Sequence, residues 1–473
     1  MEYEAVIGLE VHLQLKTKTK AFCGCSTEFG KEPNSQVCPV CLGFPGSLPV
    51  LNKVALDYAI KVALSLNCQA QEYTKFDRKH YFYPDLPKNY QISQYDLPVA
   101  KAGCLDVETK QVIIRRVHLE EDAGKLIHRR DLSLVDFNRA GIPLLEVVSE
   151  PDINSPEEAY EYLTCLKSLI EYLDVSDCDM EKGSLRCDAN VSVREKGAQE
   201  LGTKTELKNM NSFKAVKEAL GFEIERQTGL IDSGKTIIQE TRLWDTKTLQ
   251  TVSMRAKEEA KDYRYFPEPD LPPFIITRDK IEEIRKTIPE LPKPKMLRFI
   301  KDYGLSGYDA KIMVSFKPDA DYAEECLKIY PNKDKKSIAN WLIGPLLSEA
   351  RARNCSLSGL KIAPKELVEL AILVENGAIS NLVAKSVLKE QIGTGRAASE
   401  IVKSQNLIQI SDTKSLEAVI QEAVKENPKS VQDFKNGKEN AIMFLLGQVM
   451  KKTQGKANPK VAQEILKRLL KIS

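Results

Sequence analysis

The segment YEAVIGLEVHLQLK, residues 3–16, decides how the first part of the chain folds. Every second residue from Ala5 to Leu15 is apolar. A period of two predicts a β-strand that buries one face. The other face carries Glu10 and His12, which then project side by side, about 7 Å apart. A carboxylate beside an imidazole favours a divalent-metal site, and a solvent-facing strand with incidental charges is the alternative interpretation.

Two further segments place acidic residues on predicted strands. RRVHLEEDAGK (115–125) ends in the acidic run Glu120–Asp122, and GIPLLEVVSEPD (141–152) sets Glu146 among apolar residues. A lone carboxylate in such surroundings is costly unless it is paired or bound to a metal. Carboxylates and one histidine from separate strands suit Mg²⁺ held for the phosphates of a nucleotide.

Basic and amide side chains accompany these acids. GSLRCDANVSVR (183–194) again alternates, so that its polar residues share one face. A sheet face with both carboxylates and cations suits phosphoryl transfer, in which charge is neutralised on several oxygens. An ordinary polar sheet face remains the alternative for each segment taken alone. The candidate residues for this role are Lys79, Lys88, Arg186, Asp188, Asn190, Lys208, Arg255 and Arg264.

Four cysteines form a separate cluster in AFCGCSTEFGKEPNSQVCPVCLG, residues 21–43. Cys23, Cys25, Cys38 and Cys41 follow a C-x-C, twelve residues, C-x-x-C pattern. Two close pairs of thiols can enclose one tetrahedral zinc ion. A catalytic zinc usually keeps an open position and a histidine or carboxylate ligand, so we favour a structural zinc site. A redox pair is a lesser alternative.

One motif argues for a nucleotide site and is rejected. GLIDSGKT (229–236) matches the phosphate-loop pattern G-x-x-x-x-G-K-[ST]. That loop needs a strand before it and a helix after it. Here a predicted helix (212–227) enters, and TIIQETRLWD, residues 236–245, has the pattern of a strand. We interpret the match as a chance one in a helix-to-strand turn.

Composition is that of an ordinary globular protein, with 42% hydrophobic and 29% charged residues. No apolar run is long enough for a membrane span, and the start has no signal-peptide pattern, so we expect a cytoplasmic protein without membrane association. Residues 1–290 carry 39 basic and 47 acidic side chains, whereas residues 291–473 carry 30 and 20. The basic C-terminal part suits a polyanionic partner or, equally, a solvated lysine-rich helix surface.

The chain is predicted to be an α+β protein with three parts. An antiparallel-sheet domain with a zinc knob at 23–41 spans residues 1–290. Proline-rich segments precede an all-helical linker at 291–405, and a small helical tail follows at 406–473. Strong helix signals include Ser155 as an N-cap with Pro156 in the first turn, and a continuous helical pattern over 337–353.

At this point a family resemblance becomes specific. The matching segments resemble the B-subunit family (GatB) of the glutamyl/aspartyl-tRNA amidotransferases. They cover residues 3–273 almost continuously and resume in the tail. The segments are VIGLEVHLQL (6–15), FDRKHYFYPDLPKNYQISQYD (76–96), HLEEDAGK (118–125), FNRAGIPLLEVVSEPD (137–152), GSLRCDANVSV (183–193), KTELKNMNSF (204–213), DYRYFPEPDLPP (262–273) and NGKENAIMFLLGQVMKKTQGKANP (436–459).

The resemblance implies a cradle domain like that of glutamine synthetase, and an ATP-dependent ligase activity. The side-chain carboxylate of Glu on tRNA(Gln) or of Asp on tRNA(Asn) would be phosphorylated and then amidated. Ammonia would come from a partner amidase (glutaminase) subunit. A small third subunit would complete a heterotrimer.

Residue roles also follow from the resemblance. His12, Glu121 and Glu146 would hold Mg²⁺, with Glu10 and Glu120 close by. The cations and amides named above would bind ATP or the end of the tRNA, and the four cysteines would hold structural Zn²⁺. The tail residues expected to bind tRNA are Lys451, Lys452, Lys456 and Lys460.

Two other functions stay open. One is a zinc-clipped RNA-binding protein without chemistry, but acids on the sheet would then repel phosphate unless a metal were bound. The other is a carboxylate–amine ligase for a small molecule, which leaves the basic helical tail unexplained.

Overall fold

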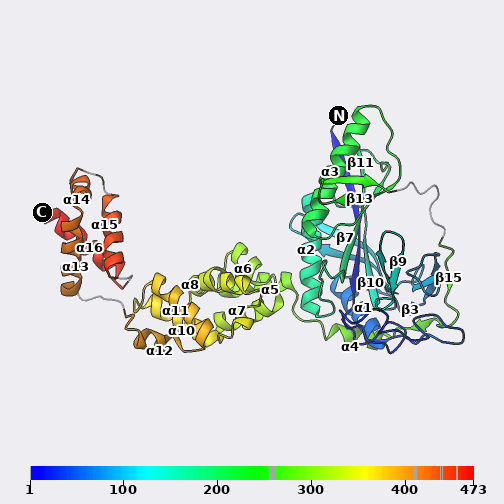
Figure 1. Cartoon of the computed structure of the whole chain (residues 1–473), viewed down its shortest axis with the longest axis horizontal. Coiled ribbons are helices and arrows are strands. Elements are labelled where there is room, and N and C mark those ends of the chain that lie inside the picture. The colour runs from blue at the N-terminus through cyan, green and yellow to red at the C-terminus, as the bar shows by residue number, and fades with distance from the viewer. Residues whose placement is uncertain are drawn as a thin grey trace. The chain divides into compact units, whose positions relative to one another are not determined.

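The computed structural model describes residues 2–254, 263–408, 413–436, 438, 440–453 and 456–472. The chain divides into two compact units, Met1–Leu291 and Pro292–Ser473 (Figure 1). The boundary expected from the sequence lies one residue away from this division. A further division near residue 405 stays a prediction.

The first unit is built on a nine-stranded sheet. Its pairs are antiparallel except for β12 with β13. The strands in spatial order are β14 (Gln250–Ser253), β13 (Thr241–Asp245), β12 (Thr205–Lys208), β11 (Leu185–Glu195), β1 (Tyr3–Gln14), β10 (Pro143–Ser149), β7 (Gln111–Glu121), β6 (Ala100–Asp106) and β2 (Gln69–Ala70).

Three small sheets and four helices complete the described part of this unit. The small sheets are β15 (Phe266–Pro267) with β4 (Asp77–His80) and β5 (Tyr90–Ser93), β16 (Phe274–Ile275) with β3 (Tyr73–Thr74), and β8 (Lys125–His128) with β9 (Ser133–Asp136). The helices are α1 (Lys53–Ser65), α2 (Pro156–Leu173), α3 (Phe213–Asp232) and α4 (Arg278–Arg285).

The hydrophobic core lies between one face of the large sheet and its helices. Ile7, Leu9, Val11 and Leu13 of β1 are fully buried and share one core with apolar residues of α1, α2 and α3. Helices α2 and α3 lie side by side against the sheet (Figure 1). Each such buried aliphatic side chain contributes roughly 1.5–3 kcal/mol. The alternation in β1 is therefore what leaves the opposite face of the sheet free for polar residues.

Local signals place the helices as predicted. The side chain of Ser155 accepts a hydrogen bond from the backbone N–H of Glu158 and caps α2, with Pro156 in the first turn. Helix α3 ends at Asp232, so the phosphate-loop match at 229–236 begins in the last turn of a helix and has no strand before it, as the sequence predicted. The strand expected at 236–245 is shorter, and only Thr241–Asp245 pairs as β13.

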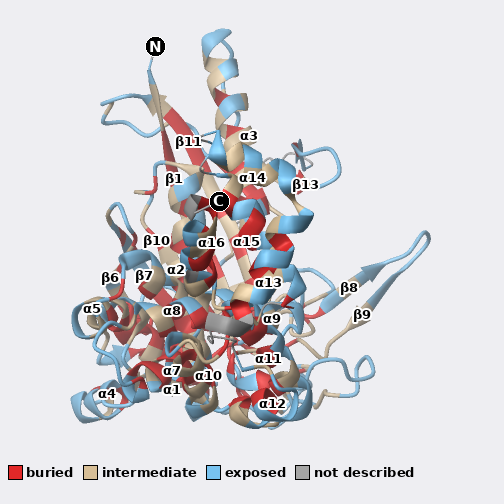
Figure 2. Ribbon diagram, turned by 90° about the vertical axis from the view of Figure 1, so that its left-hand side faces the viewer, coloured by how far each residue is buried: buried red, intermediate tan, exposed pale blue. Residues whose placement is uncertain are grey.

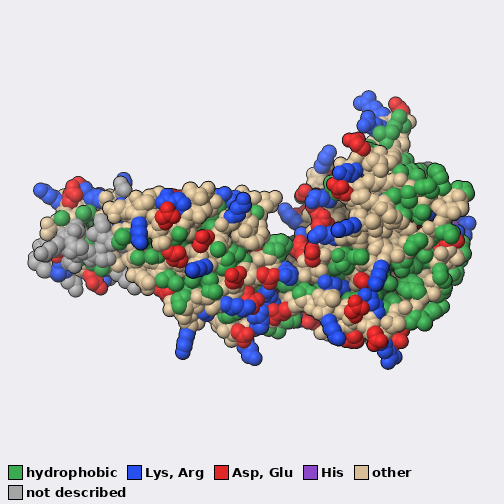
Figure 3. All heavy atoms as spheres, turned by 90° about the horizontal axis from the view of Figure 1, so that it is seen from below, with side chains coloured by type: hydrophobic (Ala, Val, Ile, Leu, Met, Phe, Trp, Pro, Cys, Tyr) green, Lys and Arg blue, Asp and Glu red, His purple; other side chains and the backbone are tan. Residues whose placement is uncertain are grey.

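The regular elements of the second unit are all helices in the part of the chain that the structure describes. Its elements are α5 (Pro292–Tyr303), α6 (Gly307–Met313), α7 (Lys317–Ile329), α8 (Lys336–Trp341), the π-helical turn η1 (Leu342–Leu346), α9 (Leu347–Ala352), the 3₁₀ turn η2 (Ser358–Leu360), α10 (Pro364–Glu375), α11 (Asn381–Thr394), α12 (Ala398–Ser404), α13 (Thr413–Glu426), α14 (Pro428–Lys435), α15 (Ala441–Lys452) and α16 (Pro459–Ile472). On the face shown in Figure 3, acidic and basic side chains of this unit lie interspersed.

The single helix predicted over 337–353 is interrupted. Residues Leu342–Leu346 form a π-helical turn that contains Pro345. Proline has no backbone N–H and its ring clashes with the carbonyl four residues earlier, so the wider turn accommodates it. The α+β prediction for the chain is confirmed by the sheet and the helical C-terminal region.

Candidate active site on the open face of the sheet

Four charged or ionisable side chains stand in one row across the central strands. His12 of β1 is paired with Glu146 of β10, and Glu146 is paired with His118 of β7. On its other side, His12 is paired with Arg186 of β11. Directly paired residues of antiparallel strands project from the same face. The row therefore lies on the face opposite the helices, because that is where the polar alternation of β1 points.

The acids and histidines of this row, with Glu120 beside it, lie close to one another. Glu146 Oε2 lies 2.8 Å from His118 Nε2 and 3.5 Å from His12 Nε2. Glu120 Oε1 lies 4.0 Å from His12 Nε2, and the Ser93 hydroxyl donates to Glu120 Oε2 over 2.8 Å. Ligand atoms of His12, Glu120 and Glu146 all lie within 4.8 Å of one another.

Burial and mutual charge shift the protonation equilibria of these groups. Burial lowers the pKa of His118, but the charges of Glu146 and Glu120 outweigh it and raise that pKa to about 9. Burial likewise opposes a charged His12, yet its hydrogen bond with Glu146 raises its pKa above the ordinary value. Burial alone would raise the pKa of Glu146, but the two histidines hold that pKa well below its usual range.

A metal ion fits the donor set of this row. Glu120 and Glu146 are buried carboxylates, and each lies within 4.0 Å of the Nε2 atom of His12. The Nδ1 atom of His118 is buried and has no hydrogen-bond partner among the residues that the structure describes. Two carboxylates and one imidazole from three strands are suitable ligands for Mg²⁺ or Mn²⁺.

The structure places Glu120, and not Glu121, beside His12 and Glu146. The carboxylate of Glu121 is instead 2.7 Å from Lys88 Nζ and accepts a hydrogen bond from the backbone N–H of Ile92. Successive side chains of a strand point to opposite faces, and His118 and Glu120 share one face of β7. Glu121 therefore projects away from the row, which corrects its expected position. Lys88, expected to bind ATP or the end of the tRNA, lies with Glu121 instead.

Several of the side chains expected to bind ATP or the end of the tRNA contact acidic residues in or near the row. Arg186 lies 2.9 Å from Asp122 Oδ1, and the ammonium of Lys208 lies 2.7 Å from Asp188 Oδ2. Among the remaining expected residues, the side-chain amide of Asn190 donates to Glu10 Oε1 over 3.0 Å.

Lys79 is held close to the acids. Burial lowers its pKa, but the charges of Glu120, Tyr265 and Glu146 raise it above the ordinary value. Its ammonium lies 4.9 Å from the centre of the Tyr263 ring. Lys79 thus adds a positive charge at the edge of an acidic row.

The expected site residue Arg264 lies away from the row. The guanidinium of Arg264 stacks 5.6 Å from the centre of the Phe82 ring, and its backbone carbonyl contacts His80 Nδ1 at 3.1 Å. Arg255 lies outside the described residues.

The expected tRNA-binding lysines of the tail differ in their surroundings. Lys451 is exposed, whereas Lys452 lies 2.9 Å from Glu426 and 3.3 Å from Glu422. Lys456 is half-buried, and the side chain of Lys460 lies outside the described residues. Lys452 is therefore already neutralised by acids of α13.

The four cysteines come together as the spacing predicted. The sulfur atoms of Cys23, Cys25, Cys38 and Cys41 lie within 4.8 Å of one another. The backbone N–H of Cys38 donates to Cys41 Sγ over 3.2 Å. Four sulfurs close a tetrahedral site completely, which suits a structural zinc ion and leaves no position for a substrate.

A buried lysine supports a charged state of these sulfurs. Lys20 is 0% exposed, and its ammonium lies 3.6 Å from Cys41 Sγ and 3.2 Å from the carbonyl oxygen of Phe137. A buried ammonium is costly unless negative charge lies close to it. Zinc-bound thiolates supply such charge, whereas neutral thiols do not.

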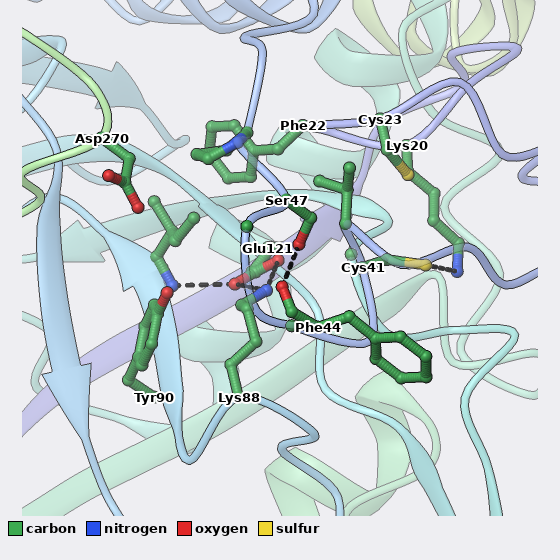
Figure 4. A pocket seen from close by; sticks show the side chains of 16 residues that line it. Lys20, Phe22, Cys23, Cys41, Phe44, Ser47, Lys88, Tyr90, Glu121 and Asp270 are labelled. Carbon is green, nitrogen blue, oxygen red and sulfur yellow. Dashed lines mark hydrogen bonds and ion pairs between the residues drawn. The ribbon is translucent and has the colours of Figure 1, made fainter.

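A cavity of about 210 Å³ joins the cysteine cluster to Glu121. Figure 4 shows the Glu121–Lys88 pair and the Lys20–Cys41 contact among the residues that line it. The cavity is therefore lined by the Glu121–Lys88 pair and by part of the cysteine cluster, which both lie apart from the row of His12, Glu146 and His118.

Sequence reasoning missed His118 and Lys20. A signal for His118 was present, because His118 and Glu120 repeat the two-residue spacing of Glu10 and His12. Lys20 gave no signal, since a lysine in a loop is usually exposed.

The fold and the site together define an α+β catalytic domain with an acidic, metal-compatible sheet face, joined to a helical unit. Residues 5–282 match the model of the GatB/GatE catalytic domain, and residues 321–470 match that of the GatB domain. The chain therefore belongs to the GatB family.

Curated relatives agree over the full length, and each is the B subunit of an aspartyl/glutamyl-tRNA(Asn/Gln) amidotransferase. The chain is 56% identical over 475 residues to the relative from Carboxydothermus hydrogenoformans, covering 98% of each chain. It is 55% identical to the relative from Thermoanaerobacter sp., with 99% of each chain covered. It is 52% identical to the relative from Thermodesulfovibrio yellowstonii, with 100% of each covered.

Proposed function

We propose that the open sheet face is where this chain, as the B subunit of a tRNA-dependent amidotransferase, activates and amidates an amino acid carried by tRNA. The substrate would be Glu on tRNA(Gln), Asp on tRNA(Asn), or both. The observation that carries the proposal is the row of His12, Glu146 and His118 across three neighbouring strands, with Glu120 beside it.

The carboxylate must be phosphorylated before ammonia can displace one of its oxygens. A carboxylate is a poor acceptor for ammonia, because its leaving group would be oxide. When a carboxylate oxygen attacks the γ-phosphorus of ATP, ADP leaves and an acyl phosphate forms. Ammonia then attacks the acyl carbon, phosphate departs and the amide nitrogen loses a proton.

The residues of the row support these two steps. His12, Glu120 and Glu146 would hold Mg²⁺, which supplies positive charge to the phosphate oxygens of ATP. Lys79, Arg186 and Lys208 border the acids and can neutralise charge on a transferring phosphoryl group. An RNA-binding protein without chemistry has no use for buried carboxylates, which repel phosphate.

The remaining parts have supporting roles. The four cysteines would hold structural Zn²⁺, and Lys20 supports that assignment by its burial next to Cys41. Ammonia would come from the partner glutaminase, and the small third subunit would complete the complex. The relatives are named as one subunit of an amidotransferase, which supports a multi-subunit enzyme.

The place of action would be the cytoplasm, where tRNA is charged. Among the residues that the structure describes, no helix is both long and apolar enough to cross a bilayer.

The direct test uses the purified chain with ATP, Mg²⁺, ammonium chloride and tRNA(Gln) charged with labelled glutamate. Ammonium replaces the glutaminase partner. Labelled glutamine on the tRNA, formed only when ATP is present, is the expected result. Glutamate alone, both here and after the other proteins of the complex are added, would overturn the proposal and favour an RNA-binding protein without chemistry.

A further inference from the structure

A second row of paired residues lies next to the row of His12, Glu146 and His118. Glu10 of β1 is paired with Val148 of β10, and Val148 is paired with Arg116 of β7. These three strands lie side by side (Figure 2). Each residue stands two positions from a member of the first row, so all three project from the same open face, about 7 Å along their strands. Glu10, Val148 and Arg116, the second row, are all partly exposed, so a ligand can reach them.

Arg116 brings a positive charge to one end of the second row. Its Nε atom is buried and has no hydrogen-bond partner among the residues that the structure describes. Other cations of the site are already paired. Arg186 lies 2.9 Å from Asp122 Oδ1, and Lys208 pairs with an acid in the same way. A buried donor without a partner is costly, and the arginine fork matches the two oxygens of a carboxylate. Arg116 therefore suits an anionic group of a ligand.

Glu10 brings a negative charge to the other end. Its Oε1 atom accepts a hydrogen bond from the amide of Asn190 over 3.0 Å. Its paired neighbour on β11 is another acid, Asp188. The ammonium of Lys208 is shared between Asp188 and Glu206, at 2.7 Å and 2.9 Å, so this one cation faces two acids besides Glu10. The end of the row at Glu10 therefore has an excess of negative charge and suits a cationic group.

The length of the second row fits an amino acid. Neighbouring strands lie about 4.8 Å apart, so the backbones of Glu10 and Arg116 are about 10 Å apart. An extended glutamyl group spans about 5 Å from its α-nitrogen to its side-chain carboxyl carbon. Hydrogen bonds of about 2.8 Å at both ends bring the total to about 11 Å. Val148 supplies an apolar surface between the two charges. An acid, an apolar residue and a cation in this order complement an α-ammonium, methylene groups and a carboxylate.

We infer that the second row holds the amino acid that the tRNA carries. Glu10 accepts hydrogen bonds from the α-ammonium, which is free in an aminoacyl ester, and Arg116 donates hydrogen bonds to the side-chain carboxylate. That carboxylate then lies next to the first row, where the proposed Mg²⁺ would hold the phosphates of ATP. The inference rests on the proposed function and names the residues that orient its substrate. It gives Glu10, which was expected beside the metal, a role in substrate binding.

The test measures binding of tRNA(Gln) to the full-length chain by fluorescence anisotropy, with Mg²⁺ and without ATP. The tRNA is uncharged, charged with glutamate, or charged with N-acetylglutamate, which lacks the α-ammonium. Wild type should bind Glu-tRNA(Gln) at least tenfold more tightly than uncharged tRNA, as expected for hydrogen bonds between charged groups. Arg116→Gln should remove most of this preference. N-acetylation should weaken binding to wild type several-fold and should have no further effect on Glu10→Gln.

Matched controls separate a substrate contact from a structural role. Arg115→Gln removes the adjacent arginine, whose side chain is 64% exposed and lies 4.0 Å from Glu150. Glu4→Gln removes an acid of the same strand as Glu10 that lies 2.6 Å from Arg194. Both variants should keep the wild-type preference for charged tRNA. Arg116→Gln removes a cation with an unpaired buried donor, so its melting temperature should equal or exceed that of wild type.

Equal affinity of wild type for charged and uncharged tRNA would overturn the inference, and so would an unchanged preference in Arg116→Gln. Amidation kinetics identify the other ligands of these residues. A KM for ATP at least tenfold higher in Arg116→Gln, with an unchanged KM for Glu-tRNA(Gln), would show that Arg116 binds phosphate and would also overturn the inference. The same holds for Glu10 if N-acetylation weakens binding equally in wild type and Glu10→Gln, because Glu10 then does not contact the α-ammonium.

The amidation assay also distinguishes the two proposals. If wild type forms glutamine on tRNA while both variants keep the preference for charged tRNA, only the second row is wrong. If the variants lose the preference but no glutamine forms, even with the other proteins of the complex, the second row stands and the catalytic proposal fails.

Discussion

His118 Nε2 lies 2.8 Å from Glu146 Oε2, on neighbouring strands 28 residues apart in the sequence. Glu146 is also 3.5 Å from His12, so two imidazoles flank one buried carboxylate. This arrangement fixes the carboxylate at the centre of the sheet face. It makes Glu146 the residue through which the other members of the row are connected.

Replacing His118 with asparagine should weaken metal binding without removing a ligand. Glu146 would lose the partner that orients it, and such outer contacts typically account for 10- to 100-fold in metal affinity. The measurement is Mn²⁺ binding by electron paramagnetic resonance. His128→Asn, on the exposed strand β8, is the control and should bind Mn²⁺ like wild type. Unchanged affinity in His118→Asn would show that His118 does not orient Glu146.

The two neighbouring glutamates of β7 should behave differently. Glu120→Gln removes the carboxylate beside His12 and Glu146 and should raise the Mg²⁺ concentration for half-maximal amidation at least tenfold. Glu121→Gln breaks the pair with Lys88 instead and should leave that concentration within about threefold of wild type. Magnesium titrations of the ammonium-dependent reaction measure both. The reverse order of effects would restore Glu121 as the ligand.

Lys20→Met should accelerate zinc loss. The variant removes the ammonium beside Cys41, so the negative charge of zinc-bound thiolates is less well balanced. Zinc release to a coloured chelator should be several-fold faster than in wild type or in Lys18→Met, which changes an exposed lysine nearby. If the site holds no metal, methionine would remove a costly buried charge and the variant would instead melt at a higher temperature than wild type.

The helical unit should lose stability in acid through Glu324. Burial would raise the pKa of Glu324, but hydrogen bonds from Arg298, Lys328 and Lys295 lower it to about 2. The carboxylate therefore stabilises the fold above its unfolded pKa, near 4.3, and that stabilisation is lost as pH falls from there toward 2.

We expect Glu324→Gln to lower the free energy of unfolding by about 2 kcal/mol at pH 7 and by much less at pH 3. Urea unfolding followed by circular dichroism measures the difference. Glu325→Gln, a neighbouring substitution, should have little effect at either pH. A cost of Glu324→Gln that is independent of pH would contradict the assignment.

Removing residues 406–473 should weaken tRNA binding at least tenfold and make it less dependent on salt. The deleted part carries a net excess of five basic side chains, and phosphate contacts release counterions on binding. ATP hydrolysis should change less than tRNA affinity, because the catalytic row belongs to the first unit. Equal affinity of the truncated and full-length chains would exclude the tail as a tRNA-binding region.

The sequence by itself determined the features that depend on local spacing. Alternation along residues 3–16 specified a strand with Glu10 and His12 on one face, because side chains of a strand repeat every two residues. The C-x-C and C-x-x-C pairs specified a four-sulfur cluster, and Ser155 with Pro156 specified the start of α2. The family resemblance rested on the same local segments.

Only the tertiary structure decided which strands are neighbours and in what register. Strand β1 pairs with β10 and β11, more than 120 residues further along the chain, and this pairing sets His12 opposite both Glu146 and Arg186. Local spacing carries no information about such distant pairs. The same register put Glu120 beside the row and turned Glu121 toward Lys88, whereas motif matching had assigned Glu121 to the metal with Glu120 close by. Lys20 needed the structure too, because its burial results from the folding of a loop over the cysteine cluster.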